Sequence, residues 1–266
     1  MGTVLDDVPF WGLIVIVITA LTASMEVGYR SGRWRHRMIR DEKEQPVGAM
    51  VASILGLLAL VLGFTFNLAA SRFDARRQVV LEESNAIGTC YLRARLLPDP
   101  ERSAITEMLR EYVDVRLLAA QKGSTLAAIS QSEAMHERLW DETSKVAERQ
   151  PQSILVGVFI QSLNEVIDLH AKRVLVGIRS RIPLVLWLSL MLIIVTGMLA
   201  VGYQAGLSAT RRSPAMIGLV FTFTIVLSLI IELDRGGQGY LSVSQQSMID
   251  LQKSLGGGGG EGVRVE

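Results

Sequence analysis

The sequence is poor in the residues that most often reveal a protein's compartment or partner. Cys90 is the only cysteine among 266 residues, so no disulfide can form within the chain, and cysteine usage does not indicate a redox compartment. The 27 basic and 26 acidic residues leave a net charge of +1. A balance this close to zero favours neither a nucleic acid partner nor an acidic substrate.

Sequence motifs of catalysis are also missing. The chain has no phosphate-binding loop, no G-x-G-x-x-G at the end of a predicted strand, no G-x-S-x-G and no HExxH. His170 has carboxylates close in sequence, at Glu165 and Asp168, but their spacing is not the Glu-x-x-His of a di-iron site. We interpret these residues as a solvated or ion-paired helix face, and we predict no enzymatic activity, no cofactor and no metal site. We predict that the acidic pairs Asp141-Glu142 and Glu82-Glu83 are exposed charges, except that Glu82 belongs to a pattern described below.

What the sequence has instead is four long apolar runs. Each has the roughly 17–25 residues that a membrane-crossing helix needs. The first run follows acidic residues rather than the basic start of a secretory signal, so we expect it to be a retained span. The predicted spans are Phe10–Val27, Val47–Ala70, Pro183–Leu207 and Ala215–Leu233, with a basic linker at Gly28–Gln45.

The part of the chain between the second and third runs, residues 71–182, has the content of charged residues that is usual in soluble proteins, and its pattern predicts helix throughout. Pro98-Asp99-Pro100 ends the first helix, and apolar residues at helical spacing continue over Glu101–Gln121, from about Ser124 to Gln150, and over Gln152–Arg181. No alternating strand pattern competes. We therefore predict an all-α, four-span membrane protein: residues 1–70 hold the first two spans, 71–182 a soluble helical insertion, 183–233 the last two spans, and 234–266 a tail with a disordered Gly-rich end.

The second span has the most informative pattern. No charge occurs from Val47 to Ala70, and Arg72, Asp74, Arg76 and Arg77 follow without a Pro or Gly, so one helix should run from lipid into water. At about 100° per residue, nine side chains share one face, which we call the second-span stripe. It either packs against a neighbouring helix or lines a pore. Its members are Ser53, Leu57, Leu60, Phe64, Asn67, Ser71, Ala75, Gln78 and Glu82.

The stretch Gly63–Arg77, GFTFNLAASRFDARR, resembles the bestrophin-like membrane proteins. The matching residues are Phe64, Asn67, Arg72-Phe73 and Arg77. Weaker similarities lie at Arg181-Ile182-Pro183 and Glu232-Leu233-Asp234, and bacterial proteins with a bestrophin-like domain share the stretches Glu83–Gly88 and Val243–Gln245. The chain departs from the family at Ala70-Ser71, where an aromatic is usual, and at Arg235-Gly236, where a Pro is usual. It also lacks the acidic cluster that binds calcium in animal members, so we predict no calcium site.

The resemblance implies a homo-pentameric ion channel in a bacterial inner membrane, whose partners are inorganic ions and the lipid bilayer. It places a hydrophobic pore neck at Phe64 by motif and at Leu60 and Gly56 by register. Polar pore-lining residues would follow at Asn67, Ser71, Gln78 and Glu82, and Arg72, Phe73, Arg77, Glu232 and Asp234 would be structural motif residues. It also implies a cytoplasmic middle domain, although basic residues near the spans lean slightly the other way.

Two alternatives stay open. A carboxylate ring at Glu82 would favour cations slightly, unless Glu82 pairs with a basic residue on an adjacent helix. The chain as a whole could also be a non-conducting oligomeric scaffold or sensor that presents its helical domain to a partner.

Overall fold

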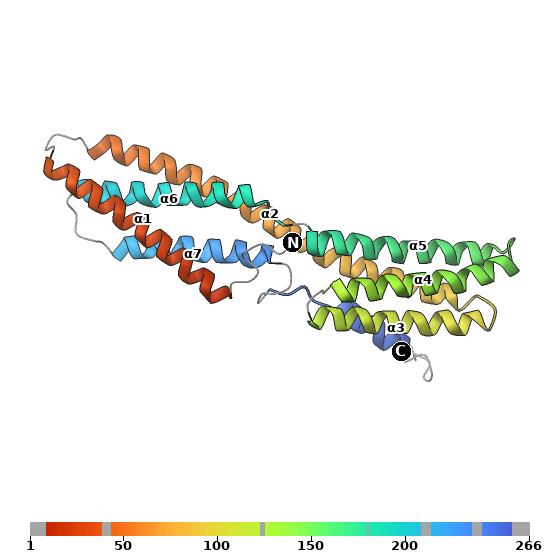
Figure 1. Ribbon diagram of the computed structural model, residues 1–266. Helices are drawn as coiled ribbons and strands as arrows, with labels where there is room; N and C mark the ends of the chain where they lie inside the picture. The colour runs from red at the N-terminus through yellow and green to blue at the C-terminus, as the bar shows by residue number, and fades with distance from the viewer. Residues whose placement is uncertain are drawn as a thin grey trace, which may run out of the picture. The chain divides into compact units, whose positions relative to one another are not determined.

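The computed structural model describes residues 9–38, 44–122, 126–179, 181–208, 214–235 and 241–256, and within these ranges it contains helices and no strand. The predicted all-α class is therefore confirmed for the described residues (Figure 1). The helices are α1 (Phe10–Met38), α2 (Glu44–Ala94), α3 (Glu101–Lys122), α4 (Leu126–Arg149), α5 (Ile154–Val174) with the π-helix η1 (Leu175–Arg179), α6 (Leu184–Leu207), α7 (Pro214–Asp234) and α8 (Gln246–Gly256).

The chain divides into two compact units. The first unit comprises Met1–Arg72 and Arg181–Leu241, and the second comprises Phe73–Ser180 and Ser242–Glu266. Helix α2 contributes to both, because it is a single 51-residue helix without a break after its apolar run. The predicted continuation of the second span into a polar helix is thus confirmed.

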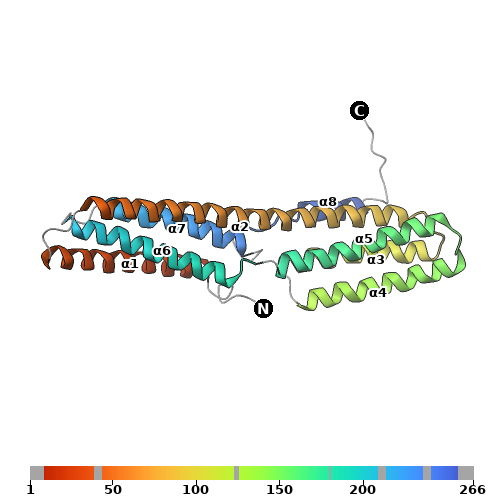
Figure 2. The same cartoon turned by 90° about the horizontal axis from the view of Figure 1, so that it is seen from above.

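In the first unit, α1 and α6 pack with their backbones in close approach, and both views show them side by side (Figures 1 and 2). A Cβ added to Gly28 would lie 2.0 Å from the Leu199 carbonyl oxygen, and one added to Gly202 would lie 2.0 Å from that of Met25. Small residues allow membrane helices to approach in this way. This packing explains why α1 continues to Met38, where a linker beginning at Gly28 was predicted: the glycine is an interface residue, not a helix end.

The second unit is built around a core to which α2, α3, α4, α5 and α8 all contribute. Residues that are fully buried include Ile87, Cys90, Leu109, Tyr112, Leu139, Phe159, Leu163 and Met248. Helix α5 begins after Ser153, whose hydroxyl accepts a hydrogen bond from the Val156 N–H (3.4 Å). The helix predicted over Gln152–Arg181 is an α-helix to Val174 and continues as a π-helix from Leu175 to Arg179.

Helix α8 lies within the predicted tail, residues 234–266, for which no helix was foreseen. Met248 is fully buried in the core of the second unit. A Cβ on Gly88 of α2 would lie 3.2 Å from Leu251, and Gln252 donates a hydrogen bond to Asp114 of α3 (2.6 Å). Figure 2 shows α8 beside α2. The acidic residues before the first span, Ser124, Gly236 and the Gly-rich end after Gly256 lie outside the described residues.

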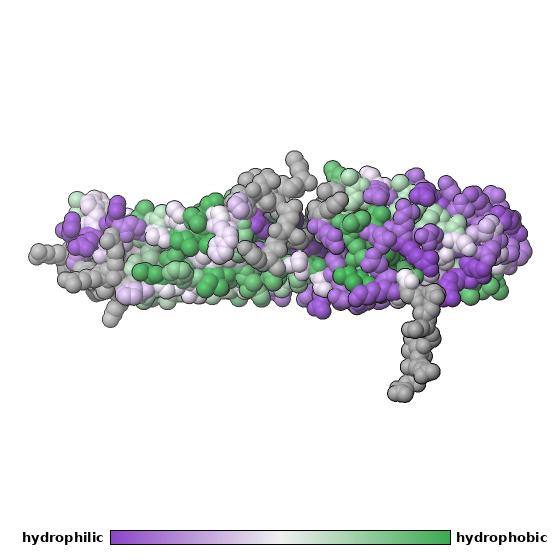
Figure 3. All heavy atoms as spheres, turned by 90° about the horizontal axis from the view of Figure 1, so that it is seen from below, coloured by the Kyte–Doolittle hydropathy of each residue, from purple (hydrophilic) through white to green (hydrophobic). Residues whose placement is uncertain are grey.

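Among the described residues, five helices are long and apolar enough to cross a membrane: α1, α2, α5 (as Ile154–Gly177), α6 and α7. Four of them correspond to the predicted spans, with α6 beginning one residue later than predicted, and α5 is an additional candidate by length and composition. The visible face of the first unit is largely apolar along its middle, whereas that of the second unit is mainly polar with an apolar patch (Figure 3).

Candidate functional site

The second-span stripe is uncovered within the first unit. The side chains of Leu57, Leu60 and Phe64 are 55%, 56% and 67% exposed, and Ser53, Asn67 and Ser71 are exposed as well. The opposite face of α2 is buried: Val51, Leu58, Leu62 and Ala69 lie about 160° from the stripe at 100° per residue and are at most 6% exposed. That face packs on α6, where a Cβ on Gly197 would lie 3.4 Å from Leu58 Cδ2.

Two positions on the exposed side of α2 have features that packing inside the protomer does not require. Gly56 is exposed, and an added Cβ would meet no atom within 4 Å. The amide of Asn67 is exposed and forms no hydrogen bond with any other described residue, whereas Ser53 bonds to its own helix through the Ala49 carbonyl (2.9 Å). The stripe therefore offers small, apolar and polar groups to something outside the protomer.

In the second unit, the continuation of the stripe ends in an ion pair. Glu82 Oε2 lies 2.8 Å from Lys172 Nζ on α5, and Gln78 Nε2 donates to Glu82 Oε1 (3.3 Å). The hydrogen bond from Lys172 lowers the pKa of Glu82, so the carboxylate is ionised at neutral pH. Gln78 and Ala75 are exposed. Of the two arrangements foreseen for Glu82, the structure has the one in which it pairs with a basic residue of an adjacent helix.

The residues of the Arg-Phe motif lie off the stripe, on other faces of α2. Arg77 is exposed, whereas Arg72 and Phe73 are half-buried. The Nη1 atom of Arg72 is buried and has no hydrogen-bond partner among the described residues.

Two stretches that resemble the family, far apart in the sequence, meet at the ends of α6 and α7. Asp234 Oδ1 accepts a hydrogen bond from the Ile182 N–H (3.0 Å), and the Asp234 carbonyl accepts one from Arg181 (2.5 Å). A carboxylate at this position is favourable because it faces the N-terminus of α6. Glu232 Oε1 accepts a hydrogen bond from the Leu241 N–H (3.1 Å). Both carboxylates are buried, so this junction fixes the chain at the start of α6 and after α7.

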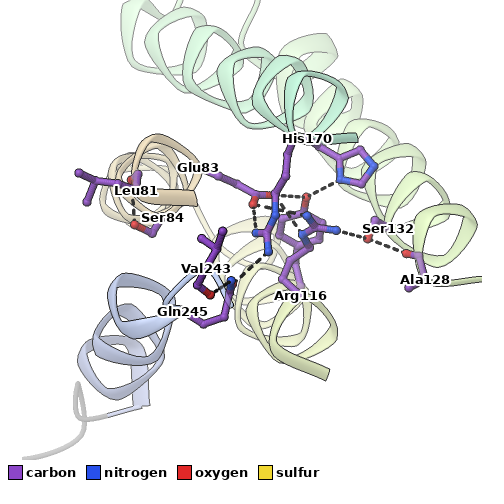
Figure 4. A network of polar contacts seen from close by, with 11 residues as sticks. Leu81, Glu83, Ser84, Arg116, Ala128, Ser132, His170, Val243 and Gln245 are labelled. Atoms are coloured by element: carbon purple, nitrogen blue, oxygen red, sulfur yellow. Dashed lines mark hydrogen bonds and ion pairs between the residues drawn. The ribbon is translucent and has the colours of Figure 1, made fainter. Parts of the chain in front are cut away.

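The second unit contains a buried polar network centred on Glu83 (Figure 4). Glu83 is 0% exposed; its Oε1 lies 3.0 Å from Arg116 Nε, and its Oε2 pairs with Arg173. Burial alone would raise the pKa of Glu83, but the charges of Arg173 and Arg116 outweigh it and lower the pKa. The prediction that Glu83 is a solvated charge is therefore wrong.

The same network joins the other two stretches that resemble the family. Arg173 Nη2 donates to Gln245 Oε1 (3.0 Å), and Gln245 in turn donates to the Val243 carbonyl (3.0 Å). Glu83–Gly88 and Val243–Gln245 thus meet through one guanidinium group. Arg116 and Arg173 were not singled out in the sequence, because a basic residue on a helix is usually solvated; only the two matched stretches hinted at this contact.

Two histidines extend the network. Tyr112 donates to Glu83 (3.3 Å) and lies 3.4 Å from His170 Nδ1, and the rings of His136 and His170 are 4.9 Å apart. Burial, together with the smaller effect of the positive charge of Arg116, lowers the pKa of both histidines to about 4. His170 is therefore a neutral core residue rather than part of a solvated face, whereas Glu165 and Asp168 are exposed as predicted. Within the described residues, no group of three or more His, Cys, Asp or Glu could hold a metal.

These features define an all-helical membrane protein with a lipid-compatible unit and a polar helical unit that share one long helix. A family model for the Bestrophin-like domain matches residues 18–248. The chain belongs to the bestrophin-like family, as its resemblance at Gly63–Arg77 predicted.

Solved structures agree with this assignment at the level of the fold. A substituted form of a bacterial bestrophin homolog from Klebsiella pneumoniae superimposes with a TM-score of 0.69 at 15% identity, covering 91% of this chain and 97% of the other. A second substituted form of that homolog gives 0.68 with the same identity and coverage. A further crystal structure, of a membrane protein, gives 0.66 at 15% identity over 94% and 98% of the two chains. No curated protein matches the sequence.

Proposed function

We propose that this chain forms a passive ion channel in a bacterial inner membrane, a homo-pentamer whose pore is lined by the second-span stripe of α2. Bestrophin homologues are ion channels, which supports a channel rather than an enzyme at the level of the family. The observation that carries the proposal for this chain is the uncovered stripe itself: one face of α2 packs on its own protomer, and the other, from Ser53 to Ser71, is exposed.

The chemistry of the stripe favours a pore over lipid. A purely apolar exposed face would suit hydrocarbon equally well. Asn67, however, presents an amide that no described residue satisfies, and an unsatisfied polar group in hydrocarbon costs several kcal/mol. Water in a pore, or a polar group of another subunit, removes that cost. The same reasoning applies to Ser71, which is exposed one turn further along the helix.

The neck would lie at Leu60 and Phe64, with Gly56 two turns before Phe64. Five copies of these two large side chains around an axis form a dry constriction that disfavours a hydrated ion, and such constrictions gate by dewetting. Gly56, with open space where its Cβ would be, would leave a wider section of the pore on one side of the neck. Arg72, Phe73, Arg77, Glu232 and Asp234 would hold the surrounding helices rather than contact the ion.

We assign the four predicted apolar runs to the membrane and α5 to the water-facing insertion, residues 71–182. In lipid, the exposed Glu165 and Asp168 of α5 would face hydrocarbon, at a cost of roughly 2.5–3.5 kcal/mol or more for such a charge. The buried face of α5 instead completes the core of the second unit through Phe159 and Leu163. Following the family resemblance, we place this unit in the cytoplasm.

A second candidate function is a non-conducting scaffold or sensor. Large apolar side chains exposed on the second unit would suit a partner protein: Leu126 is 83% exposed and Ile154 is 82% exposed. Purification, mass determination and reconstitution into planar bilayers separate the two functions. A pentamer that carries current supports the channel. A protein that stays monomeric and silent would leave the scaffold as the better account.

A further inference from the structure

The surface ion pair between Glu82 and Lys172 lies where the stripe reaches the second unit, and it is next to a buried ion pair in the sequence of both helices. Glu83, the next residue of α2, pairs with Arg173, the next residue of α5. Each pair joins residues 90 positions apart. Because a buried pair is costly to break, the inner pair locks the register of the two helices and thereby holds Lys172 beside Glu82.

The outer pair is accessible to solvent. The side chain of Lys172 is 51% exposed and that of Glu82 is 33% exposed. Gln78, one turn earlier on α2, holds the second carboxylate oxygen (3.3 Å), so Glu82 is constrained from both sides. At ideal helical geometry Gln78 and Glu82 share the face of Phe64.

We propose that Lys172 is a selectivity-determining residue of the channel, and that with Glu82 it forms a charge-compensated ring along the permeation path. This inference rests on the proposed channel function and deepens it. Each subunit contributes one carboxylate and one ammonium group, so the ring carries almost no net charge. The parent channel then discriminates weakly between cations and anions, and the slight cation preference expected from Glu82 alone is cancelled by its partner.

The inference predicts opposite effects for the two halves of the pair. Lys172→Gln leaves carboxylates without their counter-charge, and Glu82→Gln leaves ammonium groups without theirs. A ring of like charge concentrates counter-ions by about tenfold or more in a confined path, although salt reduces this effect. We expect the cation-to-anion permeability ratio, measured from reversal potentials in a KCl gradient, to rise several-fold in Lys172→Gln and to fall several-fold in Glu82→Gln. The double variant should return to the parent value.

Lys145 provides a matched control. It pairs with Glu142, and the exposed fractions of the two side chains, 54% and 27%, are close to those of Lys172 and Glu82. Both residues of this control pair are on α4, and neither pairs with a residue of the stripe. Lys145→Gln changes the net charge of the protein as Lys172→Gln does, and it should leave the permeability ratio unchanged. Because both lysines are on the surface, neither substitution should alter the thermal midpoint by more than the small amount typical of exposed pairs.

The outcomes distinguish the inference from the function on which it rests. A parent protein that carries no current, even with Leu60 and Phe64 both replaced by Ala, overturns the channel and the selectivity role together. A parent that conducts while Lys172→Gln and Glu82→Gln both keep its permeability ratio overturns the selectivity role alone. So does an equal shift in Lys145→Gln, because that would mean a general effect of surface charge.

Discussion

Glu83 and Arg173, on α2 and α5, form an ion pair inside the second unit, where Glu83 has no exposed surface. Arg116 binds the other carboxylate oxygen, and Gln245 binds the other side of Arg173. One carboxylate thus holds together α2, α3, α5 and the segment before α8. The pair contributes to the fold mainly by connecting these elements. Its net contribution to stability is small, because the desolvation of both charges offsets most of the Coulomb attraction between them.

Replacing Glu83 with Gln should therefore be strongly destabilising. It leaves the buried guanidinium group of Arg116 and the partly buried one of Arg173 without a counter-charge, a situation that typically costs about 3–5 kcal/mol. Denaturation of the detergent-solubilised protein, followed by circular dichroism, measures this loss. Glu82→Gln is the matched control, since it removes the neighbouring exposed carboxylate, whose pair contributes about 0–1 kcal/mol. Equal stability of the two variants would mean that the network does not hold the unit together.

The two buried histidines predict an acid-sensitive second unit. His136 and His170 have pKa values lowered to about 4, whereas in the unfolded chain they titrate near 6.5. The unfolded state therefore binds more protons between these values. The stability that the neutral histidines contribute is complete above about pH 6.5 and is lost as the pH falls towards 4, on the order of 3 kcal/mol for each histidine at most.

The thermal midpoint should accordingly decrease as the pH is lowered from 7 to 4.5. The groups around the imidazoles are Arg116, Arg173, Glu83 and Tyr112, and the two arginines oppose the arrival of a third positive charge. The double variant His136→Gln, His170→Gln should show a flatter pH profile over this range, even if its midpoint at pH 7 is lower. A slope identical to that of the parent would show that other groups, such as exposed carboxylates, control the acid response.

The periodicity of α2 predicted more of this molecule than any single motif. It separated Leu60 and Phe64 from Leu58 and Leu62, and the structure leaves the first pair exposed and the second pair buried. That separation needs only the 3.6-residue repeat of a helix and the packing of one face. The all-helical class followed from the same kind of local pattern.

Contacts between residues distant in sequence could not be predicted in this way. Glu83 is buried only because Arg116 and Arg173 reach it from 33 and 90 residues away, and nothing next to Glu83 in the sequence indicates that. The sequence predicted that a linker begins at Gly28. The role of this glycine in helix packing could not be predicted, because it depends on contact with α6, which is distant in sequence. Helix α8 has only 11 residues, and its stability comes from Met248 and Leu251 packing on other helices rather than from its own propensity.

The natural cysteine is not suited to test by labelling on which side of the membrane the second unit lies, so an introduced cysteine is needed. Cys90 is fully buried, and burial raises its pKa to about 12, so a maleimide should not react with the folded protein on either side of a membrane. Ala134 is exposed on α4 and offers a small position for a new cysteine. With a membrane-impermeant maleimide, Ala134→Cys should label only after lysis if the second unit is cytoplasmic. Labelling of intact cells would place this unit outside, as the count of basic residues near the spans suggests.

The proposed neck makes the most direct prediction about conduction. Replacing Leu60 and Phe64 with Ala removes two of the three large apolar side chains of the exposed stripe, and both are more than half exposed within the protomer. If they form a dry constriction, the double variant widens and wets it, and we expect a several-fold larger current in planar bilayers with little loss of stability. Leu58→Ala is the matched control on the buried face: Leu58 is 0% exposed, and its truncation should cost about 2–5 kcal/mol of stability. It should leave the current of the folded protein unchanged. A double variant that conducts no better than the parent, or that loses as much stability as Leu58→Ala, would mean that the stripe is a packing surface covered by a neighbouring subunit.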